Sequence, residues 1–332
     1  MKMLITGGAG FIGSRLAEYL HSRGCEVVVL DNLSTGRREN LAGLEGKRGF
    51  RFVVGNVADR SAVEPLVAEC EHVYHLAAPV GVKRIMEHPV LTILDNVRGA
   101  DVITESAHKY GAKMLVASTS EVYGRSLDLL DPTGSRKLSE EDYRIEGSTQ
   151  NHRWAYANTK ALDEFLALAY HKEFGFRTVV VRFFNTVGPR QLSDYGMVIP
   201  NFVRRALRKE PIEIYGTGEQ KRSFLHVNDA IRAVVALMSE PAAVGQVYNL
   251  GNPEEISIND LARRVMAVAG SDVPPVYKDY QSAYGKGFED MNRRTADVSK
   301  IRAAIGFEIT YSIEQIIADV VEYERSVMYA NV

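Results

Sequence analysis

The glycine-rich stretch near the start of the chain restricts the possible fold more than any other feature. Residues 2–6 form a short apolar run, which predicts a buried strand that stops at a glycine. Gly7, Gly10 and Gly13 follow, and residues 14–20 have the apolar spacing of a helix. Glycines let the backbone turn sharply and approach a pyrophosphate, while the new helix presents its N-terminus to that anion. This order of strand, loop and helix predicts a dinucleotide-binding unit.

The next apolar run indicates which dinucleotide is preferred. Residues 27–30 are apolar and end at Asp31, about 20 residues after the glycines, where an acid binds the adenosine ribose hydroxyls. An acid there repels a 2′-phosphate, so we expect NAD rather than NADP. Arg37 and Arg38 weaken that preference a little, unless they only belong to a solvated loop. The other predicted cofactor contacts are Phe11, Ile12, Asn32, Asn56, Val57, Leu76, Ala77 and Ala78.

Length and composition fit two modest domains or one large α/β domain with an insertion. The chain has 332 residues, an apolar fraction of 45% and a net charge of −2. Mixed charges without a basic stripe argue against nucleic-acid binding. No apolar run reaches a membrane-spanning length and no cationic, apolar leader is visible, so we expect a cytoplasmic protein. Cys25 and Cys70 lack metal-ligand spacing, so no metal site is predicted.

Further apolar runs predict an α/β fold, with a doubly wound parallel Rossmann sheet and a smaller, interleaved C-terminal α/β domain. The later strands are expected at residues 52–57, 73–78, 114–117 and 178–182, with a returning strand at 247–250. The NAD-binding domain would comprise residues 1–182 and the returning segment 223–250. The second domain would comprise residues 183–222 and 251–332.

A tyrosine and a lysine four residues apart form the candidate catalytic pair. On a helix, Tyr156 and Lys160 lie on one face, one turn from each other. A nearby ammonium favours the phenolate. Lowering the tyrosine pKa from about 10 by about three units takes roughly 4 kcal/mol, which a close ammonium and a cationic cofactor could supply in a dry site. Tyr156 would then be able to take a proton from a sugar hydroxyl. The spacing alone is common by chance, and its alternative is a surface pair on a helix.

Two long helices and a polar stretch surround this pair in the sequence. Residues 124–152 are polar and predict a loop that covers a bound ligand. The helix through Tyr156 continues to about Phe174 with apolar residues spread around it, so its apolar face needs a second partner beyond the sheet. Together with a helix at residues 93–109, it would form an intersubunit four-helix bundle, which predicts a homodimer.

The chain resembles the extended short-chain dehydrogenase/reductase family of NAD-dependent nucleotide-sugar epimerases, dehydratases and decarboxylases. The resemblance covers essentially the whole chain. Its carriers are Gly7, Gly10 and Gly13, Asp31, residues 75–78, Thr119, Tyr156 and Lys160, Asn185, residues 188–190 and Arg222.

The resemblance implies a role for each of these residues. NAD would stay bound through the cycle, and Thr119 would hydrogen-bond the sugar 4-hydroxyl while Tyr156 removes its proton. Asn185 and Arg222 would hold the diphosphate, Tyr215 would lie near the base, and Arg190 would also contact the nucleotide sugar. One departure is Asn56, where family members often have Asp beside the adenine.

The residues after Thr119 distinguish the reactions of the family. Ser120 occupies the position at which dehydratases of the family have an Asp, and its presence disfavours 4,6-dehydration. Thr119-Ser120-Glu121 is similar to the UDP-glucuronate decarboxylases, which also carry an arginine where this chain has Arg294. Arg153 is a further cation for a substrate carboxylate. This pattern implies conversion of UDP-glucuronate to UDP-xylose or a released UDP-4-keto-pentose.

Two alternatives remain open on the sequence. A UDP-sugar 4-epimerase, acting on UDP-glucose and UDP-galactose or on the corresponding uronates, would use Arg294 as a phosphate contact and Glu121 as a cap on a backbone amide. A non-catalytic NAD-binding scaffold on the same fold would not need the set of Thr119, Tyr156 and Lys160.

Overall fold

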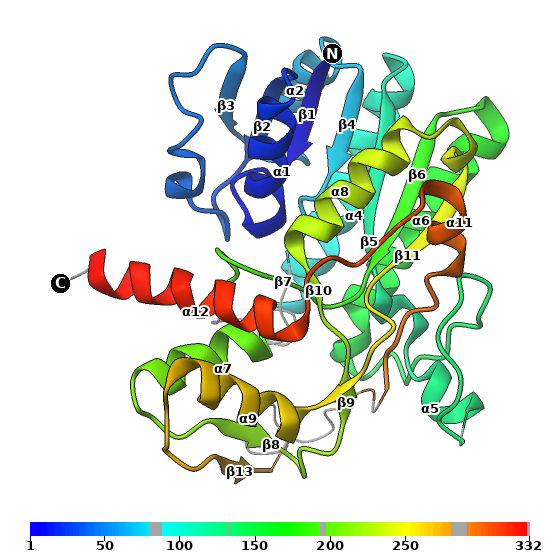
Figure 1. Ribbon diagram of the computed structural model, residues 1–332. Coiled ribbons are helices and arrows are strands. Elements are labelled where there is room, and N and C mark those ends of the chain that lie inside the picture. The colour runs from blue at the N-terminus through cyan, green and yellow to red at the C-terminus, as the bar shows by residue number, and fades with distance from the viewer. Residues whose placement is uncertain (80–87, 132, 193–196, 280–290, 292, 331–332) are drawn as a thin grey trace.

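A parallel sheet of seven strands forms the centre of the computed structural model (Figure 1). The structure describes residues 1–79, 88–131, 133–192, 197–279, 291 and 293–330. The strands are β1 (Lys2–Thr6), β2 (Glu26–Asp31), β3 (Phe50–Val54), β4 (His72–His75), β5 (Lys113–Thr119), β6 (Thr178–Phe183) and β11 (Gln246–Leu250). Their spatial order is β11-β6-β5-β4-β1-β2-β3, and every pairing is parallel. The predicted doubly wound sheet and its returning strand are therefore confirmed.

The register of the sheet brings the predicted site residues to one edge. Thr6 pairs with Leu30 of β2 and with His75 of β4. Thr119 ends β5 opposite Phe183 of β6. Since parallel strands present their carboxyl ends on the same edge, the glycine loop, Asp31 and Thr119 follow neighbouring strand ends, where ligands bind in open α/β sheets.

Two strands end three residues before their predicted ends. β3 begins at Phe50 and ends at Val54. It ends early because Asn56 Oδ1 accepts from the amide of Ala58 at 2.9 Å and turns the chain out of the sheet. β4 ends at His75 rather than at Ala78, and the next residues run beside the glycine loop instead of extending the strand. Both departures occur where the chain borders the predicted cofactor site.

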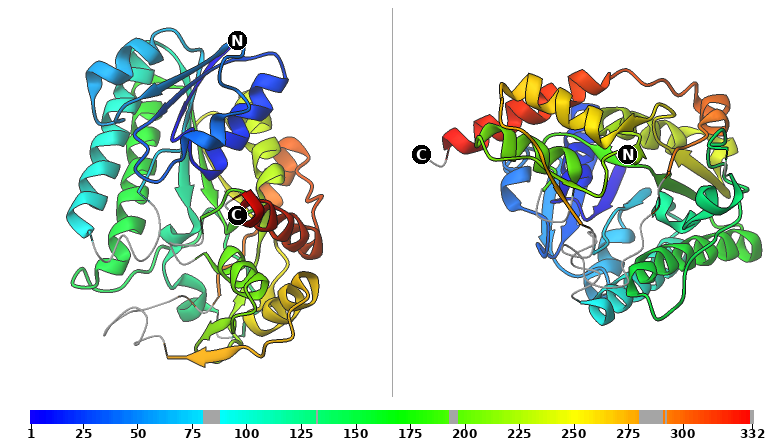
Figure 2. Two further views of the ribbon diagram at one scale, coloured as in Figure 1. Left: turned by 90° about the vertical axis from the view of Figure 1, so that its left-hand side faces the viewer. Right: turned by 90° about the horizontal axis from the view of Figure 1, so that it is seen from below.

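Helices cover both faces of the sheet. One face carries α1 (Phe11–Ser22), α8 (Val227–Ser239) and α11 (Ser299–Ile305) over one apolar core. The other face carries α2 (Arg60–Val67), α4 (Pro89–Lys109) and α6 (Ala155–Phe174), and Figure 2 shows α4 and α6 side by side. α4 starts four residues before its predicted start, because Pro89 fits the first turn of a helix. α6 ends at Gly175, which has a left-handed backbone.

A second apolar core lies beyond the sheet edge, below it in Figure 1. It is built by α7 (Val198–Leu207), α9 (Ile258–Ala269) and α12 (Ile313–Ala330), with β8 (Glu213–Tyr215) paired to β13 (Val276–Lys278). Two short pairs connect it to the sheet: β7 (Thr186–Val187) with β10 (Leu225–His226), and β9 (Lys221–Arg222) with β12 (Ile256–Ser257). The predicted domain division stays a proposal. α11, within the predicted second domain, packs on β11 and α8, and residues 280–290 and 331–332 lie outside the described residues.

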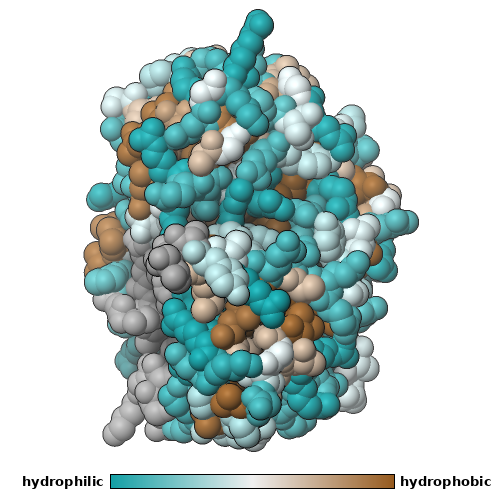
Figure 3. Space-filling model, turned by 60° about the vertical axis from the view of Figure 1, so that its left-hand side comes forward, coloured by the Kyte–Doolittle hydropathy of each residue, from teal (hydrophilic) through white to brown (hydrophobic). Residues whose placement is uncertain are grey.

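The remaining elements are short. They are η1 (Arg38–Leu41), η2 (Ser120–Tyr123), α5 (Ser126–Leu130), η3 (His152–Trp154) and η4 (Pro241–Ala243). The predicted loop at residues 124–152 thus contains a short helix, and single bridges join Gly124 to Ile145 and Leu138 to Ala296. On the face drawn in Figure 3, hydrophobic residues form small groups among hydrophilic ones. Among the helices that the structure describes, none is both long and apolar enough to cross a membrane.

Candidate active site

A cavity of about 280 Å³ lies at the carboxyl ends of the strands. Its walls include every predicted cofactor residue except Lys160: Gly7, Gly10, Phe11, Ile12, Gly13, Asp31, Asn32, Asn56, Val57, Leu76, Ala77, Ala78 and Tyr156. Thr119 and Arg190 line it as well. The cavity therefore connects the dinucleotide loop with the candidate catalytic tyrosine.

The glycine loop is too closely packed for side chains. Gly7 has a φ of +71°, and a Cβ there would lie 2.8 Å from the backbone nitrogen of Ala77. A Cβ on Gly13 would lie 2.2 Å from the carbonyl oxygen of Gly7. The turn leads directly into α1, whose N-terminus faces the cavity wall through Gly10 and Phe11. This cradle fits a pyrophosphate, which binds at helix N-termini.

Asp31 is fixed by two backbone amides. Its carboxylate accepts from Ala9 at 2.9 Å and from Leu33 at 2.8 Å. Burial raises its pKa, although these two hydrogen bonds act in the opposite direction. Arg37 also lines the cavity, whereas Arg38 forms an exposed ion pair with Glu45 at 2.8 Å. The carboxylate therefore stands at the cavity wall, as the fit of an NAD ribose requires.

The predicted lowering of the Tyr156 pKa by Lys160 is wrong for the protein itself. Burial raises this pKa most, and the carboxylates of Glu121 and Asp163 raise it further. Lys160 donates to Asp163 Oδ2 at 2.7 Å, and both side chains are buried. The positive charge of Lys160 is thus compensated by its neighbour on α6. The sequence showed the lysine, but it showed neither the burial nor the two carboxylates.

His75 has a structural role in this part of the site. Its Nδ1 forms a 2.8 Å hydrogen bond with the hydroxyl of Thr6, and burial lowers its pKa to about 3. The ring is therefore neutral at physiological pH, as expected of a histidine that supports strand ends rather than transferring protons.

Glu121 lies between two arginines. Its Oε2 accepts from Arg153 Nη1 at 2.6 Å, and its Oε1 accepts from Arg294 Nη1 at 3.3 Å. Burial alone would raise the pKa of Glu121, but Arg153 and Arg294 outweigh it and lower the pKa to about 2. Glu121 is therefore ionised at neutral pH. The cap of η2 is the Thr119 hydroxyl, which accepts from the Glu121 amide at 3.2 Å, while Ser120 is buried beside it.

The structure places the predicted substrate residues in three groups. The amide of Asn185 donates to the carbonyl of Ser223 at 2.9 Å and accepts from Arg294 at 2.9 Å, so Asn185 belongs with the Glu121 cluster. The side chain of Arg190 donates to Ser14 at 3.2 Å and to Glu18 at 2.7 Å, so it lies against α1 beside the cofactor cavity.

Tyr215 and Arg222 lie on the short strands of the second core. The Tyr215 hydroxyl donates to Glu213 at 3.3 Å, and Arg222 pairs along the backbone with Ile256.

Several residues that line the cavity were not predicted from the sequence. They include Ser34, Thr35, Asn40, Asp95, Phe183, Gln191, Leu192 and Met197. Gln191 and Leu192 directly follow the recognised residues 188–190, which could have indicated them. The others carry no motif, because long-range folding brings them to the cavity. Within the described ranges, no group of three or more His, Cys, Asp or Glu side chains is placed to hold a metal ion.

Comparisons with known proteins agree with this geometry. The profile of the NAD dependent epimerase/dehydratase family matches residues 3–251. A UDP-N-acetyl-alpha-D-glucosaminuronate decarboxylase from Bacillus cytotoxicus is 36% identical over 327 residues, which cover 98% of both chains. UDP-glucuronic acid decarboxylase 1 from Arabidopsis thaliana is 36% identical over 315 residues, covering 95% of this chain and 68% of the plant protein.

A solved structure extends the likeness to the fold. The crystal structure of UDP-glucuronic acid 4-epimerase from Bacillus cereus, in complex with UDP-glucuronic acid and NAD, superposes with a TM-score of 0.86 at 27% identity. The alignment covers 98% of this chain and 100% of the epimerase. The resemblance found in the sequence is thereby confirmed, and the chain belongs to the NAD dependent epimerase/dehydratase family, with NAD as its cofactor.

Proposed function

We propose that this protein is an NAD-dependent decarboxylase that converts UDP-glucuronate to UDP-xylose through a 4-keto sugar. The observation that carries the proposal is the ionised Glu121 held between Arg153 and Arg294 beside the Thr119 and Tyr156 site. Relatives over nearly the whole chain are named as decarboxylases of UDP-linked uronic acids, which supports this choice. Free UDP-4-keto-pentose is a second product that the same site would allow.

The cofactor residues have distinct tasks. Gly7, Gly10 and Gly13 would cradle the pyrophosphate of NAD, and Asp31 would bind the adenosine ribose. Phe11, Ile12, Asn32, Asn56, Val57, Leu76, Ala77 and Ala78 would line the rest of its site. NAD, when bound, supplies the acceptor for the hydride of C4 and returns that hydride at the end of the cycle.

Tyr156, Thr119 and Lys160 would carry the first proton transfer. Tyr156 would accept the proton of the 4-hydroxyl, and Thr119 would hold the oxygen by a hydrogen bond. Burial and two carboxylates raise the pKa of Tyr156, so its proton acceptance depends on nearby positive charge. Arg153 and Arg294 act in that direction, and Lys160 would add to them. Oxidation of C4 then makes the sugar a β-keto acid.

Arg153 and Arg294 would orient the C6 carboxylate. The bond between C5 and C6 breaks, carbon dioxide leaves, and the electron pair moves into the 4-ketone to form an enolate. A proton then adds to C5. When the hydride returns to C4, Tyr156 would give its proton back to the C4 oxygen, which yields UDP-xylose. Because Glu121 is ionised, it would not deliver its own proton; it would hold the two guanidinium groups and a water near C5. Ser120 would contact the carboxylate without the repulsion that an aspartate would bring.

The remaining residues would bind the nucleotide. Arg222 would hold the diphosphate and Tyr215 would lie near the base. The contacts of Asn185 with Arg294 and Ser223 support a second task for Asn185, the positioning of Arg294. Arg190 would face the diphosphate part of the site from the α1 side.

The 4-epimerase remains the second candidate, because the superposed crystal structure carries that activity. One experiment separates the two. The protein is incubated with UDP-glucuronate, UDP-glucose and UDP-N-acetylglucosaminuronate in turn, and the masses of the products are measured by mass spectrometry. Loss of carbon dioxide from a uronate supports the proposal. The uronate that the protein decarboxylates faster is then identified as the preferred substrate. An isomer of unchanged mass without carbon dioxide favours the epimerase. NAD binding without turnover of any substrate would favour the scaffold.

The predicted homodimer is part of this proposal. Exposed apolar residues follow one face of α4 and α6: Val90, Leu91, Ile93, Leu94, Leu162 and Phe165, the last 65% exposed. Two adjacent helices with such a face would bury it against the same pair of a second copy. Sedimentation of the wild type as a dimer, and of Phe165→Glu as a monomer, is expected; a wild-type monomer would refute the bundle. The cytoplasmic location stays a prediction.

A further inference from the structure

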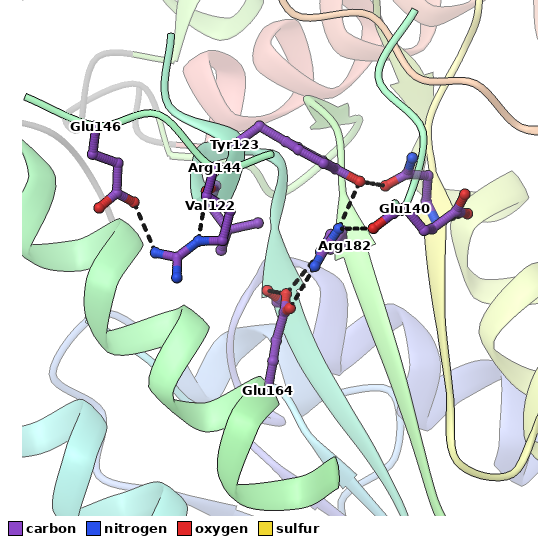
Figure 4. A network of polar contacts seen from close by, with 9 residues as sticks. Val122, Tyr123, Glu140, Arg144, Glu146, Glu164 and Arg182 are labelled. Atoms are coloured by element: carbon purple, nitrogen blue, oxygen red, sulfur yellow. Dashed lines mark hydrogen bonds and ion pairs between the residues drawn. The ribbon is translucent and has the colours of Figure 1, made fainter. Parts of the chain in front are cut away.

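A buried polar network links α6 to the strands beneath the site. Arg182 on β6 donates from Nη2 to Glu164 Oε2 at 2.7 Å and from Nε to Glu164 Oε1 at 3.0 Å. Ser118, directly before Thr119, donates to the same Oε1. Figure 4 shows the guanidinium of Arg182 between Glu164 on one side and the hydroxyl of Tyr123 on the other. One branch of this network thus supports the Thr119 strand and the Tyr156 helix.

The second branch runs through Tyr123. Arg182 Nη1 donates to the Tyr123 hydroxyl at 2.7 Å, and this hydroxyl donates to Asn249 Oδ1 at 2.7 Å. Burial raises the pKa of Tyr123, so the phenol keeps the proton that it donates. Asn249, the last residue but one of β11, is completely buried. Because its Oδ1 accepts from Tyr123, its Nδ2 must point the other way.

The side-chain amide of Asn249 also holds the segment that follows Arg294. Its Nδ2 donates to the carbonyl of Leu138 at 2.9 Å and to that of Asp297 at 3.4 Å. Leu138 in turn exchanges two backbone hydrogen bonds, one with Thr295 and one with Asp297, each at 2.8 Å. Arg294 directly precedes this ladder, and Tyr123 lies two residues after Glu121. Both partners of the Glu121–Arg294 ion pair are therefore attached to one buried chain of hydrogen bonds.

We infer that Tyr123 and Asn249 are positioning residues that hold Arg294 against Glu121 for the decarboxylation step. The inference rests on the proposed function. Neither side chain lines the cofactor cavity, so both act through the backbone of residues 295–297. Arg293 anchors the same segment from its other side through a 3.0 Å ion pair with Asp131, so loss of the Tyr123 hydroxyl loosens the segment without releasing it.

Two variants test the inference, one at each partner of the hydrogen bond between Tyr123 and Asn249. Tyr123→Phe removes the hydroxyl, whereas Asn249→Asp keeps an acceptor for Tyr123 and removes the two N–H donors. In single turnovers with UDP-glucuronate, carbon dioxide release should fall by about 10- to 100-fold while C4 oxidation, followed by the absorbance of the reduced nicotinamide, changes by less than about threefold. Reduced cofactor should therefore accumulate. The double variant should be no slower than the slower single variant, since both act on one path.

Tyr74→Phe is the matched control, because Tyr74 is equally buried in β4 and lies outside the network. It should leave both steps unchanged. An equal loss of C4 oxidation and decarboxylation in Tyr123→Phe and Asn249→Asp, or unchanged rates in both, would overturn the inference. If Tyr123→Phe fails to fold in a thermal melt, Asn249→Asp decides alone. If the wild type releases no carbon dioxide, the proposed function is refuted. If the wild type and both variants release carbon dioxide at the same rate, only the role of Tyr123 and Asn249 is refuted.

Discussion

Arg153 and Glu121 form a 2.6 Å ion pair in which the arginine side chain is only 2% exposed. The two residues are 32 positions apart, on η3 and η2, so the fold brings them together at the start of α6. A buried arginine is stabilised by a paired carboxylate, and removing one partner leaves a buried charge uncompensated. Glu121 therefore fixes both Arg153 and Arg294 before any substrate carboxylate arrives.

The first prediction concerns the pH dependence of stability. The pKa of Glu121 is lowered from 4.5 to about 2, so its ion pairs stabilise the fold fully above pH 4.5 and lose that effect as the pH falls toward 2. The difference in unfolding free energy between wild type and Glu121→Gln should be on the order of 3 kcal/mol near neutrality and shrink on acidification. Denaturant titrations across this range measure it. The exposed-site control Glu39→Gln should not reproduce the trend, and a pH-independent difference for Glu121→Gln would contradict it.

The second prediction separates Tyr156 from Thr119. Tyr156→Phe removes the proton path, so turnover should fall by at least about 10³-fold while NAD binding remains. Thr119→Ala removes one hydrogen bond to the developing negative charge and should cost about 10- to 100-fold. Steady-state rates and NAD titration provide the comparison. Near-normal activity of Tyr156→Phe would show that the catalytic assignment is wrong.

The third prediction uses the ion pair between Lys160 and Asp163. The carboxylate of Asp163 raises the pKa of Tyr156 and compensates the charge of Lys160. Asp163→Asn should therefore lower the Tyr156 pKa and move the acidic limb of the kcat profile to lower pH. Glu173→Gln, near the far end of the same helix, serves as the control. A shift of the limb to higher pH would mean that Asp163 mainly holds Lys160 in place.

The fourth prediction concerns cofactor choice. Asp31 is held at the cavity wall by the amides of Ala9 and Leu33, so it cannot easily turn away from a 2′-phosphate. The wild type should bind NADH more tightly than NADPH, and Asp31→Ala should reduce that preference. Fluorescence titration with both cofactors measures the ratio. Tighter binding of NADPH by the wild type would contradict the role of Asp31.

Local pattern predicted the sheet and the cofactor loop because these depend on short segments. The first two apolar runs, the glycine spacing and the acid that ends β2 all lie within the first 31 residues, and the later strands follow the same rules. The chemistry of the site was harder to predict from the sequence. The pKa of Tyr156 depends on burial and on Glu121 and Asp163, and the pairing of Arg153 with Glu121 depends on a long-range approach. The network through Tyr123 and Asn249 joins residues 126 positions apart, which no local spacing indicates.

The loss of the C6 carboxylate is tested most directly with UDP-glucuronate that carries carbon-13 at C6, incubated with the protein and NAD in deuterium oxide. Labelled carbon dioxide should appear in step with UDP-xylose, and each UDP-xylose should carry one solvent deuterium at C5. Tyr156→Phe should produce neither signal. A product that keeps the carbon-13 label and the mass of its substrate would contradict decarboxylation and assign the protein to the 4-epimerases.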